Sequence, residues 1–255
     1  MKLFQLTFKT LLVRKVWVVA LFCVGALPFL LPILVPSEFA LGLVEPARAQ
    51  SAWVLLWIVT AFWLFGQAAR QGEQNVRNGV GTYFHSMGQG SIHQLFQLWL
   101  AHAAVLVPLV LTAILVCCLG AVPQGSDSAG SWVITNIQYG ILFLCVTLPL
   151  LMLALALGSR FGTLIGYLIT VGLTIYGLYG VGYLEVATKV EENGLIRFLY
   201  AISPQYHLAD LTEQLVFQLG SLQWGLFFNI LAYLIGLSFI TSAGSMLTYR
   251  TTAKA

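Results

Sequence analysis

Long runs of apolar residues, separated by short polar segments, dominate the hydropathy pattern of the chain. A helix needs about 20 apolar residues to cross the hydrocarbon of a bilayer. Six runs reach this length, at 16–35, 52–69, 97–119, 132–157, 163–184 and 224–247, and none contains Asp, Glu, Lys or Arg. The pattern predicts an all-α polytopic membrane protein, with six transmembrane helices in a single transmembrane domain over residues 1–255.

Composition excludes a soluble fold. Of the 255 residues, 59% are hydrophobic and only 8% are charged, whereas about 25% are charged in an average soluble domain. The net charge of +3 is small and the basic residues are dispersed, so nucleic acid is not an expected partner. All four cysteines fall in apolar runs, where a cysteine behaves as a small buried hydrophobe.

The charged residues outside the six runs predict the orientation, because Lys and Arg are retained on the cytoplasmic side. With the N-terminus inside, the opposite side holds three basic and eight acidic residues, and the cytoplasmic acid is Glu73 alone. Both termini are therefore expected in the cytoplasm. The cytoplasmic basic residues are Lys2, Lys9, Arg14, Lys15, Arg70, Arg77, Arg160, Arg250 and Lys254.

Residues 1–15 mix Leu and Phe with Lys, Arg and Gln. This composition favours an interfacial elbow helix that lies in the headgroup plane. An ordinary basic flank is the alternative.

The only sizeable cytoplasmic loop covers residues 70–94. Its glycines interrupt helix at two places and leave a short, partly apolar piece, residues 82–87, between them. Such a piece suits docking into the cleft of a partner protein. A connector that packs on its own bundle is an equally weighted alternative.

The outer segment 185–223 is expected to contain two short helices before the last span. Ser203 and Pro204 suit an N-cap and the first helical residue, and an apolar stripe follows before Gly220. A second helix is expected at 194–202, and the two would form a re-entrant pair covered by other protein. The stripe consists of Leu208, Leu211, Leu215 and Leu219.

Small residues recur at four-residue spacing in Gly158, Gly162 and Gly166. This spacing lets helix backbones approach closely in lipid. Packing within the chain, a subunit interface and a surface that slides during a conformational change all remain open.

Catalytic motifs are absent from the sequence. No Gly-x-Ser-x-Gly or Gly-Lys-Ser/Thr motif occurs, so no catalytic residue and no ATP hydrolysis are expected in this chain. His85, His93 and His102 are eight and nine residues apart, which does not suit a metal site. No ionisable residue for ion coupling is expected within the spans, so the energy for any transport would come from elsewhere. A membrane-spanning subunit driven by a separate ATPase fits this expectation.

The whole chain resembles the permease subunit of type-2 ATP-binding-cassette (ABC) transporters, which have the type V exporter fold. The order of elbow helix, two spans, coupling helix, three spans, outer helix pair and last span matches. Residues 203–207, Ser-Pro-Gln-Tyr-His, resemble the Ser-Pro-x-Tyr-His stretch of gliding-motility and nitrous-oxide-reductase-maturation permeases. Gly81-Thr82 resembles the start of the coupling segment, but Tyr83-Phe84 departs from the acid that usually follows.

The resemblance implies a multi-pass protein of the bacterial cytoplasmic (inner) membrane that exports or extracts a substrate. The aromatic, uncharged character of the spans suits an amphipathic or lipid-like substrate better than a small ion. The partners of this protein would be a dimer of cytoplasmic ABC ATPase subunits, a second permease subunit in a homo- or heterodimer, the lipid bilayer and, in some systems, a periplasmic or extracellular accessory protein. This chain would bind no cofactor, while ATP and Mg would bind the ATPase.

By the same resemblance, two segments carry function. The ATPase would contact the coupling helix at Thr82, Tyr83, Phe84, His85 and Met87. The outer gate segment would include Ser203, Pro204, Tyr206 and His207. A non-transporting scaffold or anchor subunit of a multiprotein complex is the alternative function.

Overall fold

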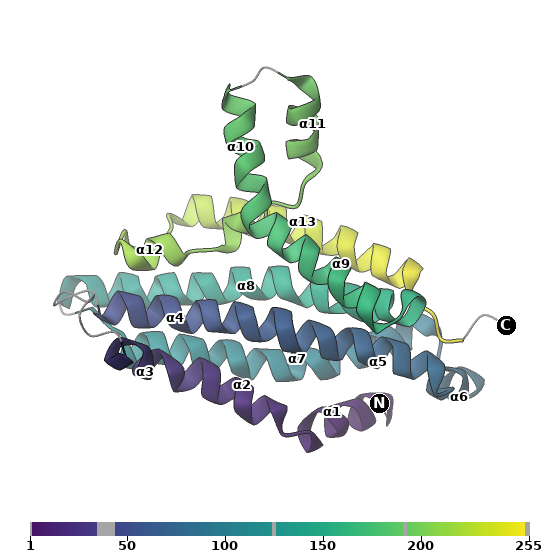
Figure 1. The fold of residues 1–255 in the computed structure, drawn as a ribbon. Helices are drawn as coiled ribbons and strands as arrows, with labels where there is room; N and C mark the ends of the chain where they lie inside the picture. Colours follow the sequence, from purple (N-terminus) through teal and green to yellow (C-terminus); the bar gives the residue numbers. More distant parts are fainter. Residues whose placement is uncertain (1, 35–43, 124–125, 191–192, 253–255) are drawn as a thin grey trace.

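The computed structural model describes residues 2–34, 44–123, 126–190 and 193–252, and in this part of the chain the regular elements are all helices. Most of them run side by side in one bundle (Figure 1). The α-helices are α1 Lys2–Val13, α2 Val16–Gly25, α3 Leu27–Leu34, α4 Val44–Val59, α5 Phe65–Arg77, α6 Val80–Ser86, α7 Ser91–Leu115, α8 Ser126–Phe161, α9 Thr163–Ile175, α10 Val181–Val190, α11 Gly194–Ile202, α12 Thr212–Val216 and α13 Trp224–Thr248.

Four short helices of other types complete these elements. The π-helix η1, Thr60–Leu64, joins α4 to α5, and the π-helix η3, Tyr176–Gly180, joins α9 to α10. The π-helix η2, Val116–Gly120, extends α7. The 3₁₀-helix η4, Tyr206–Ala209, lies before α12.

Within the described residues, five helices are long and apolar enough to cross a membrane, and they contain the last five of the six predicted spans. They cover Val44–Arg77, Ser91–Gly120, Ala129–Phe161, Thr163–Val190 and Trp224–Thr248. The first predicted span, 16–35, divides into α2 and α3, and its last residue lies outside the described residues. A sixth candidate arises only when α1 is joined to α2 and the start of α3 across a bend of 67°.

The segment predicted as an elbow forms α1, an amphipathic helix that packs on α7. Its buried residues, Leu3, Thr7 and Leu11, recur every four positions, as expected for one face of a helix. Lys15 adopts a left-handed conformation with φ 56° between α1 and α2. The sharp change in direction at the end of α1 is therefore built into the backbone.

Helix α8 forms the centre of the bundle and packs on α5, α7, α9 and α13. Its buried aromatic side chains meet those of α4: the rings of Trp53 and Tyr139 stack with centroids 4.1 Å apart. Trp53 also donates a 2.9 Å hydrogen bond to Asn136 on α8. Buried aromatic pairs in such geometry stabilise a core beyond the area that they bury.

The helix pair before the last span consists of α10 and α11, which pack on each other and project away from the bundle (Figure 1). The predicted pairing of 194–202 with a helix starting at Pro204 is wrong. Ser203 is extended, with ψ 141°, and ends α11, because a residue before proline is disfavoured in the helical region. Of the predicted apolar stripe, Leu208 lies in η4 and Leu215 in the five-residue α12, while Leu211 and Leu219 lie outside both helices.

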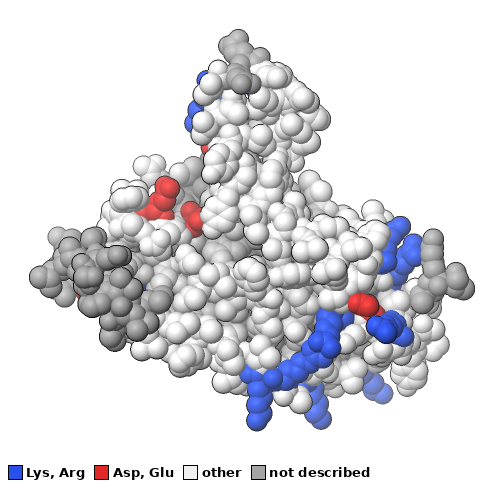
Figure 2. All heavy atoms as spheres, in the orientation of Figure 1, with Lys and Arg blue, Asp and Glu red and all other residues white. Residues whose placement is uncertain are grey.

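Charged side chains gather at the two ends of the bundle on the face shown in Figure 2. Most of the visible Lys and Arg lie at the end where Figure 1 places α1, α5 and α6, with one acidic patch among them. Other Asp and Glu atoms lie near α12 at the other end. The C-terminal end of α13 lies at the same end as α1 (Figure 1), which agrees with both termini on one side. Glu38, Glu191, Glu192 and Lys254, which contribute to the predicted sidedness, lie outside the described residues.

Candidate functional site

The short piece predicted between the loop glycines folds as the helix α6. Gly79 (φ 70°) precedes α6 and Gly88 (φ 84°) follows it. Both angles lie in the left-handed region, which glycine adopts without steric cost. The two glycines therefore isolate α6 as a separate helix between α5 and α7.

The side chains predicted to contact a partner divide into two groups. Thr82, Tyr83, His85 and Met87 are exposed, and Tyr83 and Met87 offer apolar surface that is 57% and 55% accessible. Phe84 is buried in the core of the chain itself, with 7% of its surface accessible. Phe84 therefore anchors α6 to the bundle and is not available for a partner to contact.

A buried hydrogen-bond network holds α6 against its neighbours. The side-chain nitrogen of Gln94 donates to the carbonyl oxygens of Gly81 (3.0 Å) and Gln89 (2.9 Å). The side-chain nitrogen of Asn75 donates to Gln94 Oε1 (3.4 Å) and to the Tyr249 hydroxyl (2.7 Å). These bonds join α6 to α5, to the start of α7 and to the segment after α13.

The network continues to α1. Gln97 Nε2 donates to Gln89 Oε1 (3.2 Å), and Gln97 Oε1 accepts from the backbone N–H of Phe4 (3.2 Å). A Cβ added at Gly81 would lie 2.5 Å from the carbonyl oxygen of Thr251, so the residues after α13 lie directly against α6. Elements from both ends of the chain thus meet around this helix.

The segment after α13 is also bonded to the end of α8. The backbone N–H of Arg250 donates to the Ser159 hydroxyl (3.0 Å). Burial raises the pKa of Tyr249 above its ordinary value, so its hydroxyl stays protonated at physiological pH. Asn75 Oδ1 is buried without a hydrogen-bond partner among the described residues. The other buried bonds join α1, α5, α6, α7 and the segment after α13, so this end of the bundle should move as one unit.

The predicted close packing at the glycines takes place within the chain. A Cβ added at Gly158 would lie 2.1 Å from the carbonyl oxygen of Ala69, and one at Gly72 would lie 2.1 Å from that of Leu155. A Cβ at Gly166 would lie 2.6 Å from the backbone nitrogen of Gly158. Gly158 and Gly166 therefore serve contacts of α8 with α5 and α9, and their own surfaces do not face outward.

Gly162 has a different role from the other two glycines. It forms the turn between α8 and α9 with φ 88°, a conformation that favours glycine. Glu73 on α5 accepts hydrogen bonds from the backbone N–H of Thr163 (2.8 Å) and from the Thr163 hydroxyl. Because Thr163 is the first residue of α9, Glu73 supplies an acceptor for an N–H that has no partner within that helix.

The outer gate segment predicted at 203–207 is held between the candidate spans Thr163–Val190 and Trp224–Thr248. The Tyr176 hydroxyl lies 2.6 Å from Ser203 Oγ. On the other side, the Tyr233 hydroxyl accepts from the backbone N–H of Gln205 (3.1 Å) and donates to the Ser203 carbonyl (3.4 Å). Ser203 thus contacts both η3 and α13.

Tyr206 packs into this same junction. A Cβ added at Gly177 would lie 2.3 Å from the Tyr206 ring and 2.8 Å from the Pro204 carbonyl oxygen. The absence of a side chain at Gly177 therefore makes room for Tyr206. Burial in this junction raises the pKa of the Tyr206 hydroxyl to about 12. His207 is half-buried, and its Nδ1 has no hydrogen-bond partner among the described residues.

The remainder of the outer segment is anchored to α8. The Tyr139 hydroxyl donates to Asp210 Oδ1 (2.6 Å), which also accepts from the backbone N–H of Thr212 (3.0 Å). Gln138 forms a two-way pair with the backbone of Leu222: its nitrogen donates to the carbonyl and its oxygen accepts from the N–H, both at 3.0 Å. Movement of α8 or α9 should therefore shift this segment.

Sequence reasoning missed the residues that hold α6 in place. Asn75, Gln94 and Tyr249 all lie at the borders of apolar runs, where polar residues are ordinary. One signal in the sequence is the pair of amide side chains at Gln94 and Gln97, because residues three apart lie on one face of a helix. That signal gives no information on their partners.

His102 lies inside α7 and is completely buried. Its Nδ1 lies 2.8 Å from the Leu98 carbonyl oxygen. The predicted span 97–119 therefore contains one ionisable side chain. His85 and His93 are exposed, and the described residues contain no group of three or more side chains that could hold a metal ion.

Comparison of the chain with protein-family models, curated proteins and solved structures found no match. The function of these segments must therefore be inferred from the residues and their geometry.

Proposed function

We propose that the chain is the permease subunit of an ATP-driven ABC transporter of the bacterial inner membrane, exporting or extracting an amphipathic or lipid-like substrate. A separate ATPase subunit would supply the energy. The observation that carries this proposal is α6, a short helix with an exposed apolar face that buried hydrogen bonds join to other parts of the chain.

The first step of the proposed mechanism is docking of the ATPase on α6. Tyr83 and Met87 present apolar surface four residues apart, so they share one face of the helix. An aromatic ring and a flexible thioether suit insertion into a cleft on a partner. The basic residues at this end of the molecule (Figure 2) agree with its placement on the cytoplasmic side.

The second step is transmission of movement through the bundle. Displacement of α6 would act on α5 and α7 through Asn75 and Gln94. The contact of Gly158 with Ala69 would carry it to α8. Since close-packed helices have little free volume between them, the contacts of Gly158 and Gly166 would extend the displacement to α9.

The third step takes place at the outer segment. Ser203 and Tyr206 lie between η3, at the end of α9, and α13. Rotation of α9 against α13 would pull on this segment and open or close a path to the outside. The apolar surfaces of the candidate spans suit a lipid-like substrate, and a second permease subunit would complete the path.

Photo-cross-linking in the native cell tests the docking step. A photoreactive residue at position 83 should form an adduct with a protein that mass spectrometry identifies by a Gly-Lys-Ser/Thr phosphate-binding loop. The same photoreactive residue in place of Leu111, on the exposed face of α7, should form no such adduct. Adducts with proteins that all lack such a loop would contradict the proposal and favour the scaffold function.

A double variant measures the contribution of the exposed face. Tyr83→Ala with Met87→Ala should lower recovery of the ATPase at least roughly tenfold, since removing an interface anchor commonly costs about 2 kcal/mol. Tyr183→Ala on α10, where the side chain is 79% accessible, is the matched control and should leave recovery unchanged. Full recovery with the double variant would exclude α6 as the docking element.

A further inference from the structure

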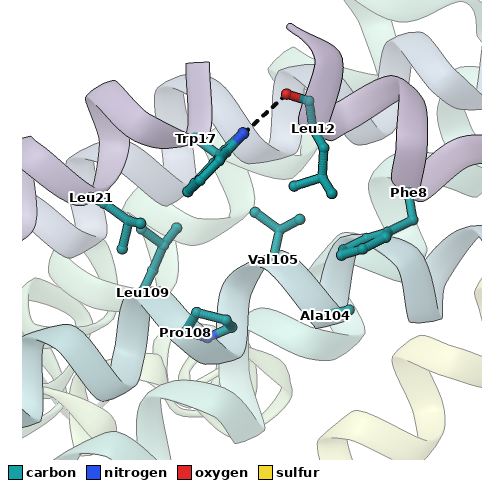
Figure 3. A pocket seen from close by; sticks show the side chains of 8 residues that line it. All are labelled: Phe8, Leu12, Trp17, Leu21, Ala104, Val105, Pro108 and Leu109. Atoms are coloured by element: carbon teal, nitrogen blue, oxygen red, sulfur yellow. Dashed lines mark hydrogen bonds between the residues drawn. The ribbon is translucent and has the colours of Figure 1, made fainter. Parts of the chain in front are cut away.

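An apolar cavity of about 150 Å³ lies between α7 and the bent pair α1–α2. Side chains from both sides face each other across it (Figure 3). Those from α1 and α2 are Phe8, Leu12, Trp17 and Leu21, and those from α7 include Ala104 and Pro108.

The walls of the cavity are fixed by the bend between α1 and α2. The indole nitrogen of Trp17 donates a 3.0 Å hydrogen bond to the carbonyl oxygen of Leu12, across the turn that contains Lys15 (Figure 3). Opposite, Ala104 has a small side chain, which leaves space next to the ring of Pro108. The bond between Trp17 and Leu12 on one side and the small side chain of Ala104 on the other therefore define the shape of the cavity.

The cavity is open to its surroundings, because Leu12 and Pro108 in its lining are exposed. An apolar cavity of this volume stays dry and accepts small apolar groups. Since α7 is one of the candidate membrane spans, the groups next to the opening would be lipid acyl chains. The cavity thus suits part of an acyl chain.

Two exposed lysines are close in sequence to residues that line the cavity. Lys9 follows Phe8 in α1, and Lys15 lies between Leu12 and Trp17 in the sequence; both lysines are exposed. Neither forms an ion pair with any of the described residues, and α1 and α2 contain no acidic residue. Long lysine side chains can keep their apolar stems on the protein while the ammonium groups reach the headgroup region.

We propose that this cavity and its two lysines bind one anionic phospholipid of the membrane. Part of an acyl chain occupies the space between Trp17 and Pro108, and the phosphate of the headgroup lies between the ammonium groups of Lys9 and Lys15. Basic residues at the cytoplasmic surface attract anionic lipids in this way. The site does not depend on the proposed transport function.

Native mass spectrometry of the purified full chain, titrated with phosphatidylglycerol and separately with phosphatidylcholine, tests the proposal. The unaltered chain should retain phosphatidylglycerol preferentially. The double variant Lys9→Gln with Lys15→Gln should bind it about 25-fold more weakly, since each basic residue near the membrane surface contributes about a fivefold effect. The matched control Arg160→Gln, at the same end of the molecule but on α8, should bind normally.

Filling the cavity tests the acyl-chain contact. Ala104→Leu should reduce retention of both lipids, while an unchanged thermal unfolding midpoint in detergent would show that the variant folds. If that variant fails to fold, Leu12→Phe at the exposed rim provides the same test. Equal retention of the two lipids by the unaltered chain, or equal loss of binding in Arg160→Gln and the double lysine variant, would overturn the proposal.

Discussion

Gly158 determines how closely α8 approaches α5. Alanine at this position would bring its Cβ to 2.1 Å from the Ala69 carbonyl oxygen, so the helices must move apart. We expect Gly158→Ala to lower the free energy of unfolding by about 1–3 kcal/mol, the usual cost of overpacking, measured by thermal or denaturant unfolding in detergent.

Gly172→Ala provides the control for this substitution. Gly172 lies in α9, and a Cβ there would meet nothing within 4 Å. Alanine favours a helix over glycine by about 1 kcal/mol, so this variant should be as stable as the unaltered chain or more so. Equal stability of the two variants would show that α5 and α8 do not depend on this contact.

The sequence predicts that Gly158, Gly162 and Gly166 permit close packing, but not which helices they contact. Four-residue spacing of small residues indicates a helix face that permits close approach, and this can be read from neighbouring positions in the sequence. The contact of Gly158 with Ala69 joins residues far apart in the chain. The exposure of Tyr83 and the burial of Phe84 likewise depend on tertiary packing of α6, which a hydropathy pattern does not contain.

Helix α6 depends on tertiary contacts for its stability. A helix of seven residues is too short to be stable alone in water, so the buried bonds from Gln94 and Asn75 determine whether it is ordered. Asn75→Ala removes the donor to Tyr249 and Gln94. Hydrogen exchange of the α6 amides should accelerate about tenfold, which corresponds to about 1.4 kcal/mol for the lost bonds.

Thr82→Ala is the control for the exchange measurement, because Thr82 is exposed on the same helix. Its α6 amides should exchange at nearly the original rate. If Asn75→Ala leaves exchange in α6 unchanged, the network does not hold the helix and cannot transmit its movement.

The outer segment shows where local sequence rules fail. Ser203-Pro204 resembles a helix start, yet Tyr206 packs against Gly177 and Asp210 bonds to Tyr139. These tertiary contacts favour an irregular path over the single amphipathic helix that the leucine spacing predicts. The helix actually starts at Thr212, whose backbone N–H donates to Asp210.

At the scale of the whole molecule, cysteine labelling tests the predicted orientation. In a background without the native cysteines, Thr82→Cys should react with a membrane-impermeant maleimide only in inverted vesicles. Glu213→Cys should react only in intact spheroplasts. Leu111→Cys, on the exposed face of α7, should react in neither, since it would face lipid.

The reverse pattern would place α6 outside the cell and exclude a cytoplasmic ATPase as its partner. Labelling of both loop positions from one side would show that the number of spans between them is even. Either result would revise the predicted six-span topology, which the five candidate helices leave undetermined.

The length of α8 has a mechanical consequence. Its 36 residues make a helix about 54 Å long, whereas the hydrocarbon of a bilayer is only about 30 Å thick. Even a strongly tilted α8 therefore extends beyond the hydrocarbon at its ends. Ser159 at one end and Tyr139, between five and six turns away, lie on the same helix, with Pro149 between them. A push on Ser159 can therefore reach Tyr139 along α8, and Pro149 is the position at which the helix would bend.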